Sequence, residues 1–294
     1  MLSSIEGQTR RPDQVIIVDG GSVSVEGIVS GCSALHIDYL QCHPPSASRQ
    51  RNSGIRWVRP EMDFVGFFDD DIVLDPRALE MMLRFWEHAP KDVAGAAFNM
   101  INHPPLSIAF LKRSSLAERI GVYGRKRGSV LPSGFHTMIG VVNEDIFVDW
   151  IPTGACLWKK SLLESKGFDE WFSGYSYLED LEFSYRIRKN HRLVVIAEAR
   201  YEHFPAPSGR IRNLLFGRRE VRNRLYFVKK NPELSMGRCY LALVLRMLMS
   251  LQLSVSELKS GYLARALGNM VELANPFKNI RKAHIEENVK NPQI

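Results

Sequence analysis

The chain has 294 residues, of which 45% are hydrophobic and 24% are charged, and its formal net charge is +7. This is ordinary globular composition, and the length suits one large α/β domain with an appendage, or two smaller domains. The four cysteines lie far apart, which excludes the paired spacing of zinc and redox motifs, and no secretory signal opens the sequence. Both observations predict a cytoplasmic protein with reduced thiols.

The start of the chain predicts a helix end followed by two apolar strands. Residues 1–9 are typical of the end of a helix, and residues 15–18 form a short apolar strand. That strand stops at the turn-forming residues Asp19-Gly20-Gly21-Ser22. A second apolar run, residues 64–68, leads directly into three consecutive aspartates. Two apolar strands therefore each deliver carboxylates at their carboxyl ends.

A helix and a third strand follow the aspartates. Asp75 and Pro76 suit the N-cap and the first position of a helix that runs through about His88. Residues 93–98 are apolar and predict the strand, whereas residues 103–148 indicate loops and short strands over the sheet.

Recognisable strand and helix patterns resume after residue 150, and their order indicates the fold class. Residues 150–158 are apolar, a helix is expected from the acid pair Glu179-Asp180 to about residue 190, and residues 193–197 predict another buried strand. Strands that alternate with helices predict an α/β protein with a Rossmann-like, mostly parallel sheet. In such sheets ligands gather at the carboxyl ends of the strands, where the aspartates lie.

The run Asp69-Asp70-Asp71 is the strongest local pattern for chemistry. Three adjacent carboxylates repel one another at the end of a buried strand unless a cation neutralises them, and Mg²⁺ and Mn²⁺ prefer such oxygen ligands and pair with diphosphates. The alternative is a solvated acidic turn before the next helix, and the run by itself does not separate the two.

Three other segments allow both a structural and a chemical role. Glu179 and Asp180 suit a helix cap, while an ionised Asp180 would also suit a general base. His203 follows a strand, and a lone histidine is more often structural than a metal ligand. The basic stretch 49–54, which includes Arg51, suits either phosphate contact or a solvated helix face.

Taken in order, these pieces resemble the family 2 glycosyltransferases of the GT-A fold. The resemblance covers about residues 8–204. Its motifs are Asp19-Gly20-Gly21-Ser22, Arg51-Asn52-Ser53-Gly54, Asp69-Asp70-Asp71, Gly154-Ala155-Cys156, Gly167-Phe168-Asp169 and Glu179-Asp180. It implies an inverting, metal-dependent transfer of a sugar from a nucleotide-sugar donor to an acceptor hydroxyl, of the type used in bacterial polysaccharide and cell-surface glycan assembly.

The resemblance also implies roles for individual residues. Asp19 would contact the donor's base or ribose, and Arg51 would lie near the donor's phosphates, together with Asp69 and Asp70. Asp71, Asp69 and His203 would hold Mn²⁺ or Mg²⁺, with Asp71 as the more direct ligand. Asp180 would be the general base, and Glu179 would position it or bind the acceptor, which would be a glycan or a lipid-linked molecule.

Two departures from the family pattern motivate an alternative. The family's first strand precedes a helix, and here Met1 already lies within that helix; Gly20 stands where the family has a second aspartate. The alternative function is therefore a catalytically inactive GT-A domain that acts as a binding or scaffold subunit.

The tail carries the whole net charge. Residues 209–230 hold eight Lys or Arg and one acid, and residues 238–255 form an apolar stretch interrupted by Arg246. We expect residues 1–208 to form the GT-A domain and residues 209–294 a basic, amphipathic helical extension. The stretch suits a helix that lies on a membrane or packs on the domain better than one that spans. Peripheral attachment to the anionic inner face of the cell membrane is thus expected, with a solvated helix face as the equal alternative. A nucleic-acid partner is not expected, because no reading motif accompanies the charge.

Overall fold

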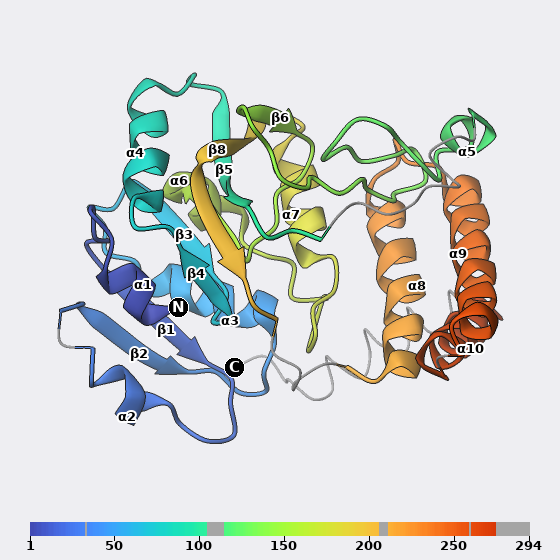
Figure 1. Cartoon of the computed structure of the whole chain (residues 1–294), viewed down its shortest axis with the longest axis horizontal. Helices are drawn as coiled ribbons and strands as arrows, with labels where there is room; N and C mark the ends of the chain where they lie inside the picture. The colour runs from blue at the N-terminus through green and yellow to red at the C-terminus, as the bar shows by residue number, and fades with distance from the viewer. Residues whose placement is uncertain (33, 105–114, 206–210, 259, 275–294) are drawn as a thin grey trace. The chain divides into compact units, whose positions relative to one another are not determined.

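A computed structural model describes residues 1–32, 34–104, 115–205, 211–258 and 260–274. The chain forms two compact units (Figure 1). Unit 1 comprises residues 1–107, 127–129 and 138–207, and unit 2 comprises residues 108–126, 130–137 and 208–294. Unit 2 thus includes two segments that a division at residue 208 places in the first domain.

Unit 1 begins with a small two-stranded parallel sheet. Its elements in chain order are α1 (Leu2–Glu6), β1 (Val15–Asp19), α2 (Glu26–Val29), β2 (Ile37–Gln41) and α3 (Ala47–Trp57). β1 and β2 run parallel, with Val15 opposite Ile37 and Asp19 opposite Gln41. The expected strand at residues 15–18 is confirmed. The strand β2 was not expected, because its half-exposed sequence lacks a clear apolar run.

The larger sheet of unit 1 has six strands. They are β3 (Phe64–Phe68), β4 (Ile72–Leu74), β5 (Val93–Met100), β6 (Ile146–Val148), β7 (Ala155–Lys159) and β8 (Arg192–His203). The order is β3-β7-β5-β8-β4, and β6 also pairs with β8. β3, β5 and β8 run in one direction, while β4, β6 and β7 run in the other. The expected α/β class is confirmed.

Three helices of unit 1 accompany this sheet: α4 (Ala78–His88), α6 (Lys160–Lys166) and α7 (Glu179–Ile187). α4 begins two residues later than the sequence predicts, and its N-cap is Arg77. The prediction that Asp75 is the N-cap is wrong. Its Oδ1 accepts the backbone N–H of Arg77 at 3.1 Å in the turn that precedes the helix, and its carbonyl accepts the N–H of Ala78 at 2.9 Å.

The core of unit 1 places apolar residues of α4 against the sheet. Met82 of α4 and Ile72 of β4 are almost fully buried, and Phe98 of β5 packs in the same cluster. Aromatic residues from β7 and α7 form a second contact, where Trp158 meets Phe183 edge-to-face at 4.8 Å. Burial on this scale stabilises by about 25 cal/mol for each Å² of apolar surface removed from water. These contacts hold the strand ends that carry the site.

The two sheets of unit 1 are not joined by a β-ladder in the described residues. β1 pairs only with β2, and β3 pairs only with β7, so each keeps one strand edge without a partner strand. Both strands line a cavity of about 1240 Å³, which is also lined by residues of α1, α3 and α4. The carboxyl ends of both strands, at Asp19 and Asp69, lie at this cavity.

Unit 2 is built around three mutually packed helices (orange to red in Figure 1). They are α8 (Asn213–Lys230), α9 (Met236–Ser256) and α10 (Ser260–Ala274); the short helix α5 (Ser115–Arg119) belongs to the same unit. α8 and α10 approach backbone to backbone. A Cβ atom on Gly217 would lie 2.1 Å from the carbonyl oxygen of Arg265, and one on Gly268 would lie 2.1 Å from that of Leu214. Only glycine fits at these two positions.

The helix predicted over residues 238–255 is confirmed as α9. It has 21 residues and a mean hydropathy of 1.5, so its length and composition would also suit a membrane crossing. That observation is weak by itself, since core helices of soluble proteins have the same property. Arg246, which interrupts the apolar stretch in the sequence, is 39% exposed and pairs with the buried Glu220 of α8, with 3.5 Å between Nε and Oε1.

Candidate active site

The three aspartates lie at the end of β3, as predicted. The backbone N–H of Asp69 donates to the carbonyl of Gly154 at 2.9 Å, which holds the first aspartate beside the strand β7. The Asp69 side chain remains 47% exposed. Loss of contact with water raises its pKa, Arg51 opposes this shift, and the neighbouring Asp71 adds to it. A carboxylate in this position is receptive to a cation.

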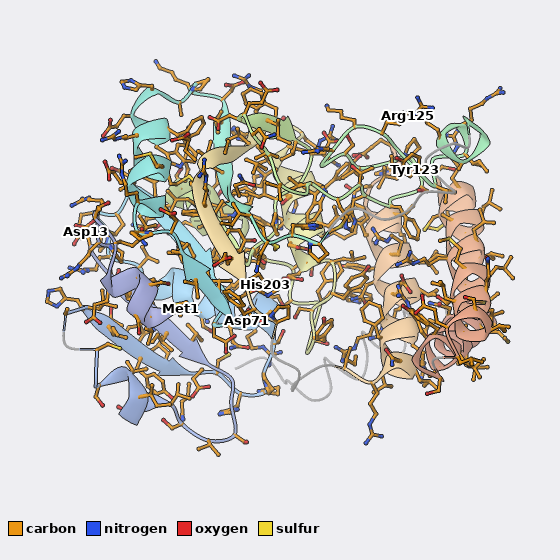
Figure 2. The ribbon with its side chains drawn as sticks, in the orientation of Figure 1. Met1, Asp13, Asp71, Tyr123, Arg125 and His203 are labelled. Carbon is orange, nitrogen blue, oxygen red and sulfur yellow. The ribbon has the colours of Figure 1, made fainter. Side chains whose placement is uncertain are left out.

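Asp71 and His203 lie next to each other (Figure 2). The strand β4 begins at Ile72 and pairs with the end of β8, where Ile72 lies opposite His203. This pairing places Oδ1 of Asp71 3.1 Å from Nε2 of His203. Asn102 holds the His203 backbone, accepting from its N–H and donating to its carbonyl, both at 2.9 Å. Residues 132 positions apart thus share one corner of the sheet.

Arg51 connects the aspartates to the acid pair. It lies on α3 with a side chain that is 14% exposed. Its Nη1 donates to Oε1 of Glu179 at 2.5 Å, and its Nη2 lies 3.5 Å from Oδ1 of Asp69. The guanidinium also lies over the ring of Phe168, 5.6 Å from the centroid. The interpretation of residues 49–54 as a solvated helix face therefore does not describe Arg51.

The segment before the acid pair has unusual backbone geometry. Ser176 has φ +45° and Leu178 has φ +78°, although neither is glycine. Non-glycine residues disfavour this left-handed region, and such strain is found most often at functional sites. Leu178 is buried and precedes the first turn of α7, so the strained turn aims Glu179 and Asp180 into unit 1.

Glu179 and Asp180 occupy different environments. Glu179 is 8% exposed and also accepts from Oγ1 of Thr153 at 3.4 Å. Burial raises the pKa of Glu179, and the charge of Arg51 counteracts this. Burial, and then the adjacent charge of Glu179, raise the pKa of Asp180 to about 7. The N–H of Leu181 at the start of α7 donates to Oδ1 of Asp180 at 2.7 Å and lowers the pKa of Asp180, but burial and the charge of Glu179 outweigh this effect.

Asp19 anchors its own loop. Its Oδ1 accepts the N–H of Gly21 at 2.7 Å, and its Oδ2 accepts the hydroxyl of Tyr39 at 2.6 Å and the N–H of Val25 at 3.3 Å. The Tyr39 hydrogen bond, followed by that of Gly21, lowers the pKa of Asp19. Tyr39 is a site residue that the sequence analysis missed, because no motif surrounds it.

The residue after Asp19 has little room for a side chain. A Cβ atom on Gly20 would lie 3.0 Å from Oε1 of Gln50 and 3.0 Å from Cβ of Pro45. Gln50 donates from Nε2 to the carbonyl of Val18 at 2.8 Å. The space that a second aspartate would need is therefore occupied by α3 and the loop before it.

The structure brings most of the predicted residues into one region of unit 1. Arg51, Asp69 and Glu179 are in direct contact, and Asp180 and Asp71 flank them in sequence. Asp70 is exposed beside Asp69, and Asp19 lines the same cavity as the aspartates. In the described part of the chain, no three carboxylate, imidazole or thiolate groups form a complete metal-binding cluster. The predicted set Asp71, Asp69 and His203 thus remains a prediction, with one pair in contact.

Comparisons with known proteins agree with this arrangement. Residues 1–142 match the family Glycosyl transferase family 2. No protein of curated function matches the sequence.

Two solved structures are similar in fold. Residues 1–349 of TarS from S. aureus superpose with a TM-score of 0.51 at 16% identity, over 94% of this chain and 76% of TarS. The mannosyltransferase PcManGT from Pyrobaculum calidifontis, solved with GDP-Man and Mn²⁺, superposes with a TM-score of 0.50 at 13% identity, over 99% of this chain and 81% of its own. At these identities the similarity concerns the fold. Together with the match of residues 1–142 to glycosyl transferase family 2, it shows that the chain has the fold of the GT-A glycosyltransferases.

Proposed function

We propose that this glycosyltransferase moves a sugar from a nucleotide-sugar donor to an acceptor hydroxyl with inversion, and that it needs a divalent cation. The observation that carries the proposal is the contact network in which Arg51 meets both Asp69 and Glu179. The Arg51 guanidinium thereby connects Asp69, on the expected donor side, with Glu179, on the expected acceptor side. A solvated acidic turn would not need a buried arginine.

The donor would lie in the cavity between β1 and β3. Asp19 and the loop it anchors would face the donor's base or ribose, and the exposed Asp70 lies on the same rim. Arg51 would lie near the phosphates and supply positive charge as the diphosphate departs. PcManGT binds GDP-Man, which supports a nucleotide-sugar donor here without naming its base.

Asp71 and His203 suit a divalent cation. A carboxylate oxygen and an imidazole nitrogen in contact, both on half-exposed side chains, form a two-residue ligand set, with Asp69 as a third candidate. Mg²⁺ and Mn²⁺ sites of this kind use one or two carboxylates and complete their coordination with substrate phosphates and water. When bound, the cation would neutralise charge on the leaving diphosphate. PcManGT was solved with Mn²⁺.

Asp180 would take the proton from the acceptor hydroxyl. A base works best when its pKa lies near the operating pH, and that of Asp180 is about 7. Glu179, neutralised by Arg51, would position Asp180 or bind the acceptor. One base acting on the face opposite the leaving group gives a single displacement and hence inversion, as in inverting glycosidases. The acceptor would be a glycan or a lipid-linked molecule of cell-surface glycan assembly.

The test is titration of UDP, GDP and dTDP with and without Mn²⁺, followed by transfer assays with the corresponding sugars. We expect one nucleotide to bind in an Mn²⁺-dependent manner. Asp71→Ala should remove the Mn²⁺ dependence, whereas Asp75→Ala, in the next turn, should keep it. Binding unchanged in Asp71→Ala would refute the metal assignment. Binding of no nucleotide would support the inactive scaffold instead.

A further inference from the structure

The α9–α10 pair of unit 2 exposes an apolar surface. On α9 the exposed large apolar residues are Leu241, Val244, Leu248 and Val255, and on α10 they are Leu263, Leu267, Met270 and Val271. The spacing of three, four or seven residues places each set along one side of its helix. Between Arg238 and Glu257 the exposed residues are otherwise only Gln252 and Ser256, and on α10 only Ser260 and Ala274. We call these eight residues the apolar face.

Two glutamates of the three helices are buried and pair with arginines of neighbouring helices. Glu220 is 1% exposed and accepts two hydrogen bonds from Arg265, at 2.6 and 2.9 Å. Glu272, also buried, accepts from Nε of Arg218 at 3.1 Å. Asn269 donates to the carbonyl of Gly217 at 2.9 Å. Glutamates that are buried and paired, close glycine contacts and an exposed apolar face are together a pattern found in helices in contact with lipid.

Charge at the edge of the face favours lipid over a protein partner. Among the described residues 211–258 and 260–274, four exposed basic residues lie at the helix ends, against two exposed acids, Glu233 and Glu257; the basic ones are Arg212, Lys229, Lys230 and Arg238. Positive side chains beside an apolar surface match anionic headgroups above acyl chains. The eight residues include no aromatic side chain, although aromatic and arginine anchors dominate protein–protein contacts.

We propose that the apolar face inserts into the acyl region of an anionic membrane leaflet, with α9 and α10 lying in the plane of the membrane. α8 packs against both helices and ends in the exposed Lys229 and Lys230, which would lie near the headgroups. This interaction is independent of the proposed transfer reaction. It also differs from attachment by the basic segment alone, because Arg218 is paired with Glu272 and Arg224 is 1% exposed.

The experiment is flotation of the full chain with vesicles of phosphatidylcholine, with and without phosphatidylglycerol, at low and high salt. The variant Leu248→Glu/Leu267→Glu places two charges on the face. The control Ile28→Glu/Met138→Glu makes the same change at exposed apolar residues of unit 1. We expect the wild type and the control to bind anionic vesicles, less strongly at high salt, and the face variant to bind at least tenfold more weakly.

A second measurement guards against misfolding of the face variant. Leu248→Trp keeps the face apolar, and Ile28→Trp is its control. Brominated phospholipids should quench the new fluorescence in the first variant and not in the second. The proposal is overturned if the wild type does not float, if the face variant floats equally, or if both tryptophans are quenched alike. A concentration-dependent dimer that only the face variant disrupts, without vesicle binding, would assign the face to a second copy.

Discussion

The two units place their charges in opposite ways. In unit 1 the charged side chains meet at the ends of β3 and β8, where Asp69 and Asp71 remain accessible. In unit 2 the paired glutamates Glu220 and Glu272 are buried, and α9 and α10 expose the apolar face. An accessible network suits a polar ligand, while an internal one holds helices together. Both units bury an arginine–glutamate pair, so the accessible carboxylates beside that pair, more than the pair itself, distinguish the candidate site.

The largest effect is expected for the variant that tests whether Asp180 of unit 1 is the general base. Asp180→Asn keeps the shape of the side chain but cannot accept a proton, so sugar transfer should fall by about 10²–10⁴-fold while donor binding is retained. Initial rates and nucleotide titrations measure the two quantities. Transfer at the wild-type rate would give the base role to another residue, with Glu179→Gln the next variant to assay.

A smaller effect on stability compares the ion pairs of the two units. Arg51→Ala leaves Glu179 buried without its counter-charge, which should lower the free energy of unfolding by about 3–5 kcal/mol. Arg49→Ala on the same helix removes a pair with the 43% exposed Glu170 and should cost less than about 1 kcal/mol. Urea unfolding measures both.

The matched change in unit 2 is Glu220→Gln, which leaves Arg265 without the negative charge that it faces. It should also destabilise, yet it should keep the nucleotide affinity that Arg51→Ala loses. Equal loss of nucleotide affinity in both variants would remove the distinction between the units.

The pH dependence should report the raised pKa of Asp180. The base must be ionised, so transfer should be about tenfold slower at pH 6 than at pH 8 for a pKa of about 7.

The raised pKa of Asp180 also affects stability, because the native state disfavours the ionised carboxylate. Below about pH 4 the carboxyl is protonated in both the folded and the unfolded chain, so it does not lower the free energy of unfolding. The loss of stability grows as the pH rises and is complete above about pH 7. Asp180→Asn should therefore be more stable than the wild type at pH 8 and similar to it at pH 4. A flat rate profile would contradict this assignment.

The smallest expected effect concerns the outside of unit 2. Leu248→Ala, at a residue 50% exposed, should change the free energy of unfolding by less than about 0.5 kcal/mol. Leu243→Ala on the same helix, where the side chain is 1% exposed, should cost about 2–5 kcal/mol. Thermal unfolding of the two variants gives the comparison. A large loss at Leu248 would mean that the apolar face is covered in the folded chain.

Local patterns predicted the elements that have strong local signatures. The apolar runs of β1, β3 and β5 and the acid pair at the start of α7 were found because each is visible within a few residues. β4 was missed, since its three residues form a strand only by pairing with Tyr201, Glu202 and His203. Asp75 was misassigned because an aspartate before a proline suits a turn as well as a cap.

The connections within the site had no local signature. The contact between Arg51 and Glu179 joins residues 128 positions apart, and the hydrogen bond between Tyr39 and Asp19 depends on the register of β1 with β2. The inward direction of Arg246 depends on where α8 packs. Motifs therefore predicted which residues are candidates for binding or catalysis, and tertiary packing determines which of them are in contact.

One turn of α3 has a consequence for how ligands communicate. Gln50 holds the carbonyl before Asp19, while the next residue, Arg51, holds Asp69 and Glu179. Since no ladder joins β1 to β3 in the described residues, this helix connects the loop that Asp19 anchors with the acid pair. A nucleotide that shifts the loop would displace both neighbours on α3 together. Ligands at the two ends would then be coupled, and by thermodynamic reciprocity each would change the affinity for the other by the same factor.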